Sequence, residues 1–81
     1  MNKIETIKKD SVTIYVLKSK KGNYLTENDG WTNKLKNAYY FISCSSAQYM
    51  QVNDFKNCKV VEVRLRTWQA IEEIGEVKEW N

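Results

Sequence analysis

The residues of this chain that could take part in a reaction are two cysteines and a pair of neighbouring glutamates. Cys44 and Cys58 are the only cysteines in 81 residues, and the chain contains no histidine. Because histidine is the usual proton carrier near neutral pH and the commonest metal ligand, Cys44 has no base and the two cysteines cannot complete a four-ligand zinc site. We therefore expect two reduced, partly buried thiols, with a disulfide between them as the alternative.

Glu72 and Glu73 are the candidates for acid–base catalysis or for a divalent cation. In the helix expected for this part of the chain, adjacent side chains diverge by about 100° and do not converge on one atom. The glycines Gly22, Gly30 and Gly75 are isolated and form no phosphate-binding loop. We expect no catalytic residue, no cofactor and no metal, hence a protein that is not an enzyme; the enzymatic alternative is a subunit whose site a partner completes.

Basic and aromatic residues favour binding instead. Three lysines crowd residues 18–21, and two arginines share one face of a later strand. Ten residues are aromatic, more large rings than so thin a core is expected to hide, and Trp, Tyr and Arg contribute most of the binding energy in protein interfaces. The candidate partner-binding residues are Lys18, Lys20, Lys21, Tyr24, Trp31, Tyr39, Tyr40, Arg64, Arg66 and Trp80.

Charge is unevenly distributed along the chain. Residues 1–66 hold twelve Lys or Arg and six Asp or Glu, giving +6, whereas residues 67–81 hold one lysine and four glutamates, giving −3. The pattern fits either solvated surfaces that attract one another or a basic face for an anionic partner. A sheet with lysines, arginines and aromatics can hold single-stranded nucleic acid, but the net charge of +3 is low for a dedicated binder.

The elements that would position these residues follow from the spacing of apolar side chains. Alternation predicts strands at residues 11–18 and 58–66, the second with one buried and one wet face. Gly22 supplies a positive φ angle for a turn, and the extended run at 24–26 follows it. The first strand and this run are therefore expected to form an antiparallel hairpin.

A third strand and a helix are expected next. The strand could begin at Trp31, after a tight turn, but its composition places it near residues 38–42. Ser45 and Gln48 fit a capping box, so a short helix is expected from Ser45 to residues 53–54. This helix would carry Ala47 and Met50 on its inward face.

The two ends of the chain complete the predicted fold. Thr67 is expected to cap a second short helix that Gly75 ends, and residues 76–80 to form an edge strand or a tail. Residues 1–10 are expected to be a short edge strand or a frayed lead-in. We expect one α+β domain over residues 1–81, in which a small twisted antiparallel sheet of three to five strands carries one or two short helices on one face.

No apolar run approaches the roughly 20 residues that cross a bilayer, and residues 1–5 lack the hydrophobic core of a signal peptide. We expect a cytoplasmic protein without a membrane partner, in the cytosol of the host cell if a phage encodes it. Because a domain of this size has a thin core, formation of a homodimer is one way to supplement its stability.

The chain resembles small proteins of phages and mobile elements of low-GC Gram-positive bacteria in a pattern of five short motifs. These motifs are YVL at 15–17, GNYL at 22–25, Trp31, AYYF at 38–41 and SSA at 45–47. The resemblance covers about residues 12–50 and transfers no functional residue. It implies a small non-enzymatic protein of a class in which some members, anti-CRISPR proteins among them, inhibit host replication or defence machinery.

The leading hypothesis is therefore a protein-binding module that occupies the surface of a host protein through an aromatic and basic patch. The alternative is an accessory nucleic-acid-binding protein that uses a basic and aromatic face of its sheet.

Overall fold

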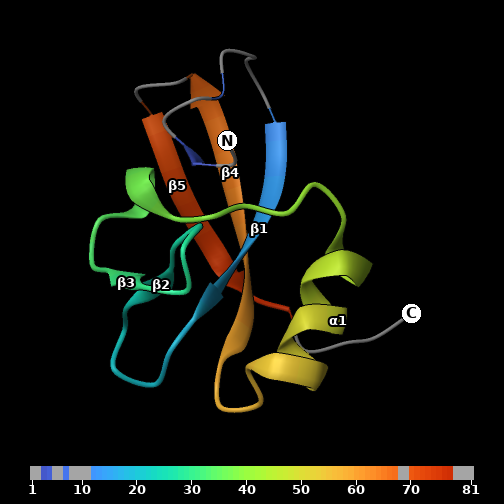
Figure 1. Ribbon diagram of the computed structural model, residues 1–81. Coiled ribbons are helices and arrows are strands. Elements are labelled where there is room, and N and C mark those ends of the chain that lie inside the picture. The colour runs from blue at the N-terminus through green and yellow to red at the C-terminus, as the bar shows by residue number, and fades with distance from the viewer. Residues whose placement is uncertain (1–2, 5–6, 8–11, 68–69, 78–81) are drawn as a thin grey trace.

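The computed structural model describes residues 3–4, 7, 12–67 and 70–77. These residues form one antiparallel sheet in the order β3-β2-β1-β4-β5, with a single α-helix beside it (Figure 1). The expected α+β class, with three to five strands and one or two helices, is confirmed. The elements are β1 (Val12–Lys18), β2 (Tyr24–Leu25), β3 (Trp31–Thr32), the 3-10 turn η2 (Leu35–Asn37), α1 (Cys44–Asp54), β4 (Lys59–Thr67) and β5 (Ala70–Glu76).

The sheet curls into half a barrel. β2 and β5 are separated by β1 and β4, which in a flat sheet would keep them about 14 Å apart. The Tyr24 hydroxyl nevertheless donates a 2.6 Å hydrogen bond to Glu73 of β5, so the sheet must bend toward the face from which both side chains project. That face holds the larger core cluster, whose strand residues are Ile14, Val16, Tyr24, Val61, Val63 and Leu65.

The opposite face of the sheet packs against α1. Leu17 and Val60 are buried there with Ala47 of the helix, in a second cluster that also contains Phe41. β1 and β4 are therefore covered on both faces at this end. Val16 and Leu17 are adjacent residues that point to opposite faces of the sheet, and for this reason both are fully buried. Ala47 is buried on the inward face of the helix, as expected. β1 pairs antiparallel with β2 through Lys18 and Tyr24, so the expected hairpin is confirmed.

The described residues near the N-terminus belong to the core. Ile4 and Ile7 are buried in the larger cluster, and the Ile4 amide donates to the Ala38 carbonyl at 3.1 Å. Lys3 forms an antiparallel bridge with Tyr39. A frayed lead-in is therefore wrong for these positions, because the curl of the sheet leaves apolar surface that the isoleucines cover.

The third strand differs from its predicted position. β3 consists of Trp31 and Thr32, while residues 38–42 form only isolated bridges. Tyr15 and Phe41 exchange two backbone hydrogen bonds of 2.9 and 2.7 Å, and the Tyr39 amide donates to the Leu25 carbonyl. The segment thus crosses from β2 to β1 on its way to α1 (Figure 1), and successive residues cannot follow one partner strand as a ladder requires.

The second predicted helix is wrong, because residues 70–76 form β5. The register pairs Glu62 with Gly75 and Val63 with Glu73, which leaves Ile74 as the extra residue of a bulge. A bulge interrupts the alternation of a strand, so Ile71 and Ile74 fall three positions apart, the spacing that predicts a helix. Gly75 has a φ of 156° and follows the bulge rather than ending a helix. Trp68 and residues 78–81 lie outside the described part of the chain.

Helix α1 begins at Cys44, and its N-cap lies two residues before the cap predicted at Ser45. Ser43, with extended backbone angles, is the N-cap, and its hydroxyl oxygen accepts from the Ser46 amide at 3.1 Å. The bridge between Tyr15 and Phe41 holds the chain extended up to this point, so the first hydroxyl after it can serve as the cap. The helix ends at Asp54, as expected. Across the described residues, no helix combines the length and the apolar character that crossing a membrane requires.

Candidate interface surfaces

The residues predicted to bind a partner lie on separate surfaces. Lys20, Lys21 and Trp31 line one hollow, whereas Tyr39 and Tyr40 line a groove beside α1. The hollow adjoins the turn that follows α1, and the groove lies at the start of this helix of 11 residues, which is about 16 Å long. The described residues therefore offer two candidate surfaces in place of the one aromatic and basic patch expected from the sequence.

Of the other predicted contact residues that the structure describes, Tyr24, Arg64 and Arg66 line neither surface, whereas Lys18 lines a hollow that adjoins the first. Tyr24 is buried in the core, and Lys18 is bonded to a glutamate of β5. Arg64 and Arg66 are exposed on β4, about 17 and 23 Å along the strand from Lys59 at the lysine-rich end. Arg66 pairs with a second glutamate at 3.6 Å. Trp80 lies outside the described residues.

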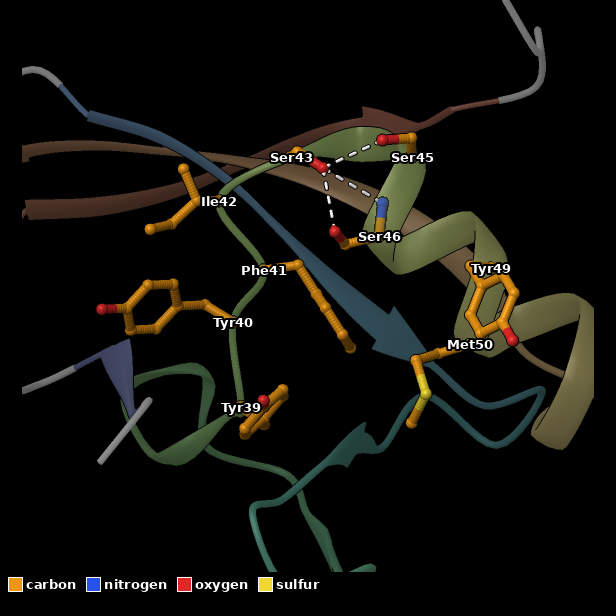
Figure 2. A pocket seen from close by; sticks show the side chains of 9 residues that line it. All are labelled: Tyr39, Tyr40, Phe41, Ile42, Ser43, Ser45, Ser46, Tyr49 and Met50. Atoms are coloured by element: carbon orange, nitrogen blue, oxygen red, sulfur yellow. Dashed lines mark hydrogen bonds between the residues drawn. The ribbon is translucent and has the colours of Figure 1, made fainter.

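The first surface is an open groove of about 700 Å³ between residues 39–43 and the first two turns of α1 (Figure 2). Tyr40 and Ile42 stand on the side of the extended segment, and Tyr49 and Met50 on the side of the helix. Its full lining consists of Tyr39, Tyr40, Phe41, Ile42, Ser43, Ser45, Ser46, Tyr49 and Met50. We call it the aromatic groove.

Two side chains of the aromatic groove are strongly exposed. Ile42 is 78% and Tyr49 67% accessible, although both are large and largely apolar. No charged side chain is among the lining residues. Depletion of charge together with enrichment in Tyr and Met is the composition that separates the centre of a protein interface from the rest of a surface.

The walls of the aromatic groove are held by contacts beneath it. Phe41 is bound to β1 through both backbone hydrogen bonds, and its ring meets the Tyr39 ring edge to face with centroids 5.0 Å apart. The Ser43 hydroxyl also contacts the Ser45 and Ser46 hydroxyls at 3.1 and 3.0 Å. These contacts fix the spacing of the two walls before any partner arrives.

Sequence reasoning missed Ile42 and Tyr49 as contact residues. The helix was predicted to carry Ala47 and Met50 on its inward face, which leaves Tyr49 on the solvent-exposed face. An aromatic residue on a predicted solvent-exposed face could have indicated a contact residue. Ile42 gave no such signal, because it was assigned to a strand in which alternate residues are buried.

The second surface is built from lysines at the opposite end of α1. Two adjoining hollows of about 460 and 450 Å³ share Ser19, Lys20, Asn57 and Cys58. The first extends to lysines of β1, of β4 and of the turn after α1, and the second extends to the indole of Trp31. We call the two together the lysine trough, whose basic residues are Lys18, Lys20, Lys21, Lys56 and Lys59.

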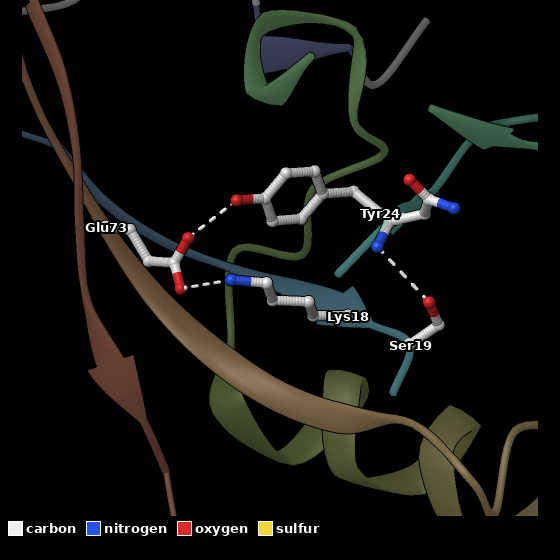
Figure 3. A network of polar contacts seen from close by, with 5 residues as sticks. Lys18, Ser19, Tyr24 and Glu73 are labelled. Carbon is white, nitrogen blue, oxygen red and sulfur yellow. Dashed lines mark hydrogen bonds and ion pairs between the residues drawn. The ribbon is translucent and has the colours of Figure 1, made fainter. Parts of the chain in front are cut away.

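Lys18 is the lysine of the trough whose charge is neutralised by an ion pair. Its ammonium lies 2.9 Å from a Glu73 carboxylate oxygen and 5.4 Å from the centre of the Tyr24 ring (Figure 3). The hydrogen bond to Glu73 raises the pKa of Lys18. Burial alone would raise the pKa of Glu73, but the hydrogen bonds from Tyr24 and Lys18 prevail and lower it. This network closes the curled sheet.

Both cysteines are free thiols, as expected. Burial, and secondarily the charge of Glu62, raises the pKa of Cys44, although its position in the first turn of α1 favours a thiolate. Burial also raises the pKa of Cys58. Neither environment provides the lowered pKa that activates a cysteine as a nucleophile.

Among the described residues, no three His, Cys, Asp or Glu side chains gather closely enough to hold a metal ion. Comparison of the chain with protein-family models, with curated proteins and with solved structures found no match.

Proposed function

We propose that this protein is a non-enzymatic protein-binding module and that the aromatic groove is its contact surface. The observation that carries this proposal is the exposure of Ile42 and Tyr49 on either side of an uncharged groove. An exposed aliphatic and an exposed aromatic side chain are costly to solvate, and their clustering is typical of surfaces that a partner covers.

The partner that suits this groove is another protein that presents an apolar side chain with hydrogen-bonding groups around it. The apolar side chain would pack against Tyr49 on the helix side, and Ile42, which points away from the helix (Figure 2), would add a second apolar contact beyond the extended segment. Polar groups around it would meet the exposed hydroxyls of Ser45 and Ser46. A nucleic acid suits the groove poorly, since no cation lines it to pair with phosphates.

A second copy of the chain is a weaker candidate for this surface. The described residues bury fourteen apolar side chains on the two faces of the sheet, and no buried side-chain nitrogen or oxygen among them lacks a hydrogen bond. Completing the fold therefore does not require a second copy, and we assign the groove to a different protein. Inhibition of a host defence or replication protein is the role that the resemblance of residues 12–50 favours.

Site-specific photo-cross-linking tests the proposal. A benzophenone amino acid replaces Tyr49 in one protein and, as a control, Glu27 in another, since Glu27 is exposed in the β2–β3 turn and outside the groove. We expect one protein from a lysate of the source cells to cross-link at position 49 and not at 27, and the same protein, once purified, to bind the unmodified chain.

Two outcomes would overturn the proposal. Cross-links at position 49 that join only two copies of this chain, with a dimer in sedimentation velocity, would make the groove a homodimer interface. Equal cross-linking at positions 49 and 27 would show that the groove has no special contact role.

A further inference from the structure

The lysine trough carries four lysines outside any ion pair of the described residues, although the charge of Lys59 also acts on Glu73. Lys20, Lys21, Lys56 and Lys59 make no ion pair with any carboxylate of the described residues. No acidic side chain is among the residues that line either hollow of the trough. Four ammonium groups around one depression repel one another, and an anion placed among them relieves that repulsion.

The β1–β2 loop with Lys20 and Lys21 lies at the same end of the molecule as the α1–β4 loop with Lys56, which leads into Lys59 at the start of β4 (Figure 1). In the β1–β2 loop, the Asn23 amide donates to the Ser19 hydroxyl at 3.2 Å and the Gly22 amide to the Ser19 carbonyl at 3.0 Å. In the α1–β4 loop, the Cys58 amide donates to the Phe55 carbonyl at 2.9 Å. These bonds fix the backbone from which the lysines project, so the lysines start from defined positions around the trough.

An aromatic ring stands at one end of the trough. Trp31 is 46% exposed, and its indole meets the Phe55 ring edge to face at 6.3 Å with an interplanar angle of 86°. Phe55 thus supports the indole and leaves part of it accessible beside Lys20 and Lys21. Amide side chains of Asn23 and Asn57, which both donate and accept hydrogen bonds, lie in the same lining.

We propose that the lysine trough binds single-stranded nucleic acid, with phosphates along the lysines and one base against the Trp31 indole. A ring next to a line of cations is the arrangement that holds unpaired bases, whereas the bases of a duplex are stacked inside it and cannot reach the indole. A polyanion without bases, such as an acidic peptide, would use the lysines and leave Trp31 and the two asparagines without a role. This site is separate from the aromatic groove and goes beyond the proposed protein binding.

Fluorescence anisotropy with a labelled thymidine oligomer of about ten nucleotides tests the proposal. If four lysines each displace counterions from a single strand, the logarithm of the association constant falls with the logarithm of salt concentration with a slope of about −3. Lys20→Gln or Lys56→Gln is expected to make the slope shallower by about 0.7. Lys36→Gln is the matched control, because Lys36 is an exposed lysine of η2 outside the trough.

The role of the indole has its own variants. Trp31→Ala is expected to weaken binding by about 5- to 150-fold, and Trp31→Tyr, which keeps a stacking ring, by much less. Tyr49→Ala should leave oligonucleotide binding unchanged, so failure of this proposal and failure of the protein-binding proposal are distinguishable. An equal loss with Lys36→Gln and Lys20→Gln, full competition by polyglutamate, or no effect of Trp31→Ala would each overturn it.

Discussion

The Tyr24 hydroxyl donates a 2.6 Å hydrogen bond to a Glu73 carboxylate oxygen and so joins β2 to β5 across the two strands that separate them. The other carboxylate oxygen accepts from Lys18 at 2.9 Å (Figure 3). Both contacts lie on the face toward which the sheet curls. They connect distant parts of the half-barrel through one side chain.

Removal of this contact should destabilise the fold. Tyr24→Phe keeps the buried ring and deletes the hydroxyl, and we expect it to lower the free energy of unfolding by about 1 kcal/mol. A double-mutant cycle with Glu73→Ala, measured by urea denaturation, should give a coupling energy of about 0.5 to 1 kcal/mol. Additive effects of the two substitutions would show that the hydrogen bond contributes nothing to the fold.

Stability should also depend on the ionisation of Glu73. The pKa of this carboxyl in the folded protein lies below its usual value of 4.5, so the ionised form stabilises the fold above that pH. This contribution is lost as the pH falls below about 4.5 and through the lowered pKa. In urea denaturation at a series of pH values, Glu73→Gln should therefore show a smaller loss of stability over that acid range than the natural chain. Parallel curves for the two proteins would contradict this assignment.

Two serines at the start of α1 should contribute differently to the stability of the fold. Ser43→Ala removes the hydroxyl that accepts from the Ser46 amide and should cost about 1 kcal/mol of unfolding free energy. Ser45→Ala is the matched control, because Ser45 lies inside the helix and alanine is the better helix former there. Thermal or urea denaturation of both variants checks the prediction, and a larger loss for Ser45→Ala would restore the cap expected from the sequence.

The β1–β2 loop requires a glycine. Gly22 has a φ of 89°, and a Cβ added there would meet no atom within 4 Å, so the cost of a substitution is one of backbone strain alone. We expect Gly22→Ala to lower the free energy of unfolding by about 1 kcal/mol, because side-chain-bearing residues rarely adopt this conformation. A stability equal to that of the natural chain would mean that the loop adopts another turn.

The sequence predicted the elements whose side chains alternate without interruption. β4 follows the alternation of Val61, Val63 and Leu65 against charged neighbours. β1 places Ile14 and Val16 on one buried face, and Gly22 marks the hairpin. β5 was missed because the bulge at Ile74 sets its apolar residues at a helical spacing. The spacing of apolar residues in the sequence can indicate a regular strand. It does not reveal a bulge, because the extra residue is recognised only from its pairing with the neighbouring strand.

The candidate surfaces were predicted only in part. Residue types indicated that Lys20, Lys21 and Trp31 would be exposed, and the structure places them in one lining. The contribution of Lys56 could not be foreseen, since it comes from a loop that meets the hairpin only in the folded chain. The aromatic groove depends in the same way on the crossing of residues 39–43 beside α1.

The most direct test of the proposed function is the dissociation constant of the complex with the protein that cross-links at position 49. We expect Tyr49→Ala to raise this constant by about 30-fold or more, as truncation of an aromatic side chain at the centre of an interface does. Arg64→Ala, which removes an exposed side chain outside the groove, should change it by less than about threefold, and both variants should remain as stable as the natural chain. Equal dissociation constants for Tyr49→Ala and the natural chain would contradict the proposal.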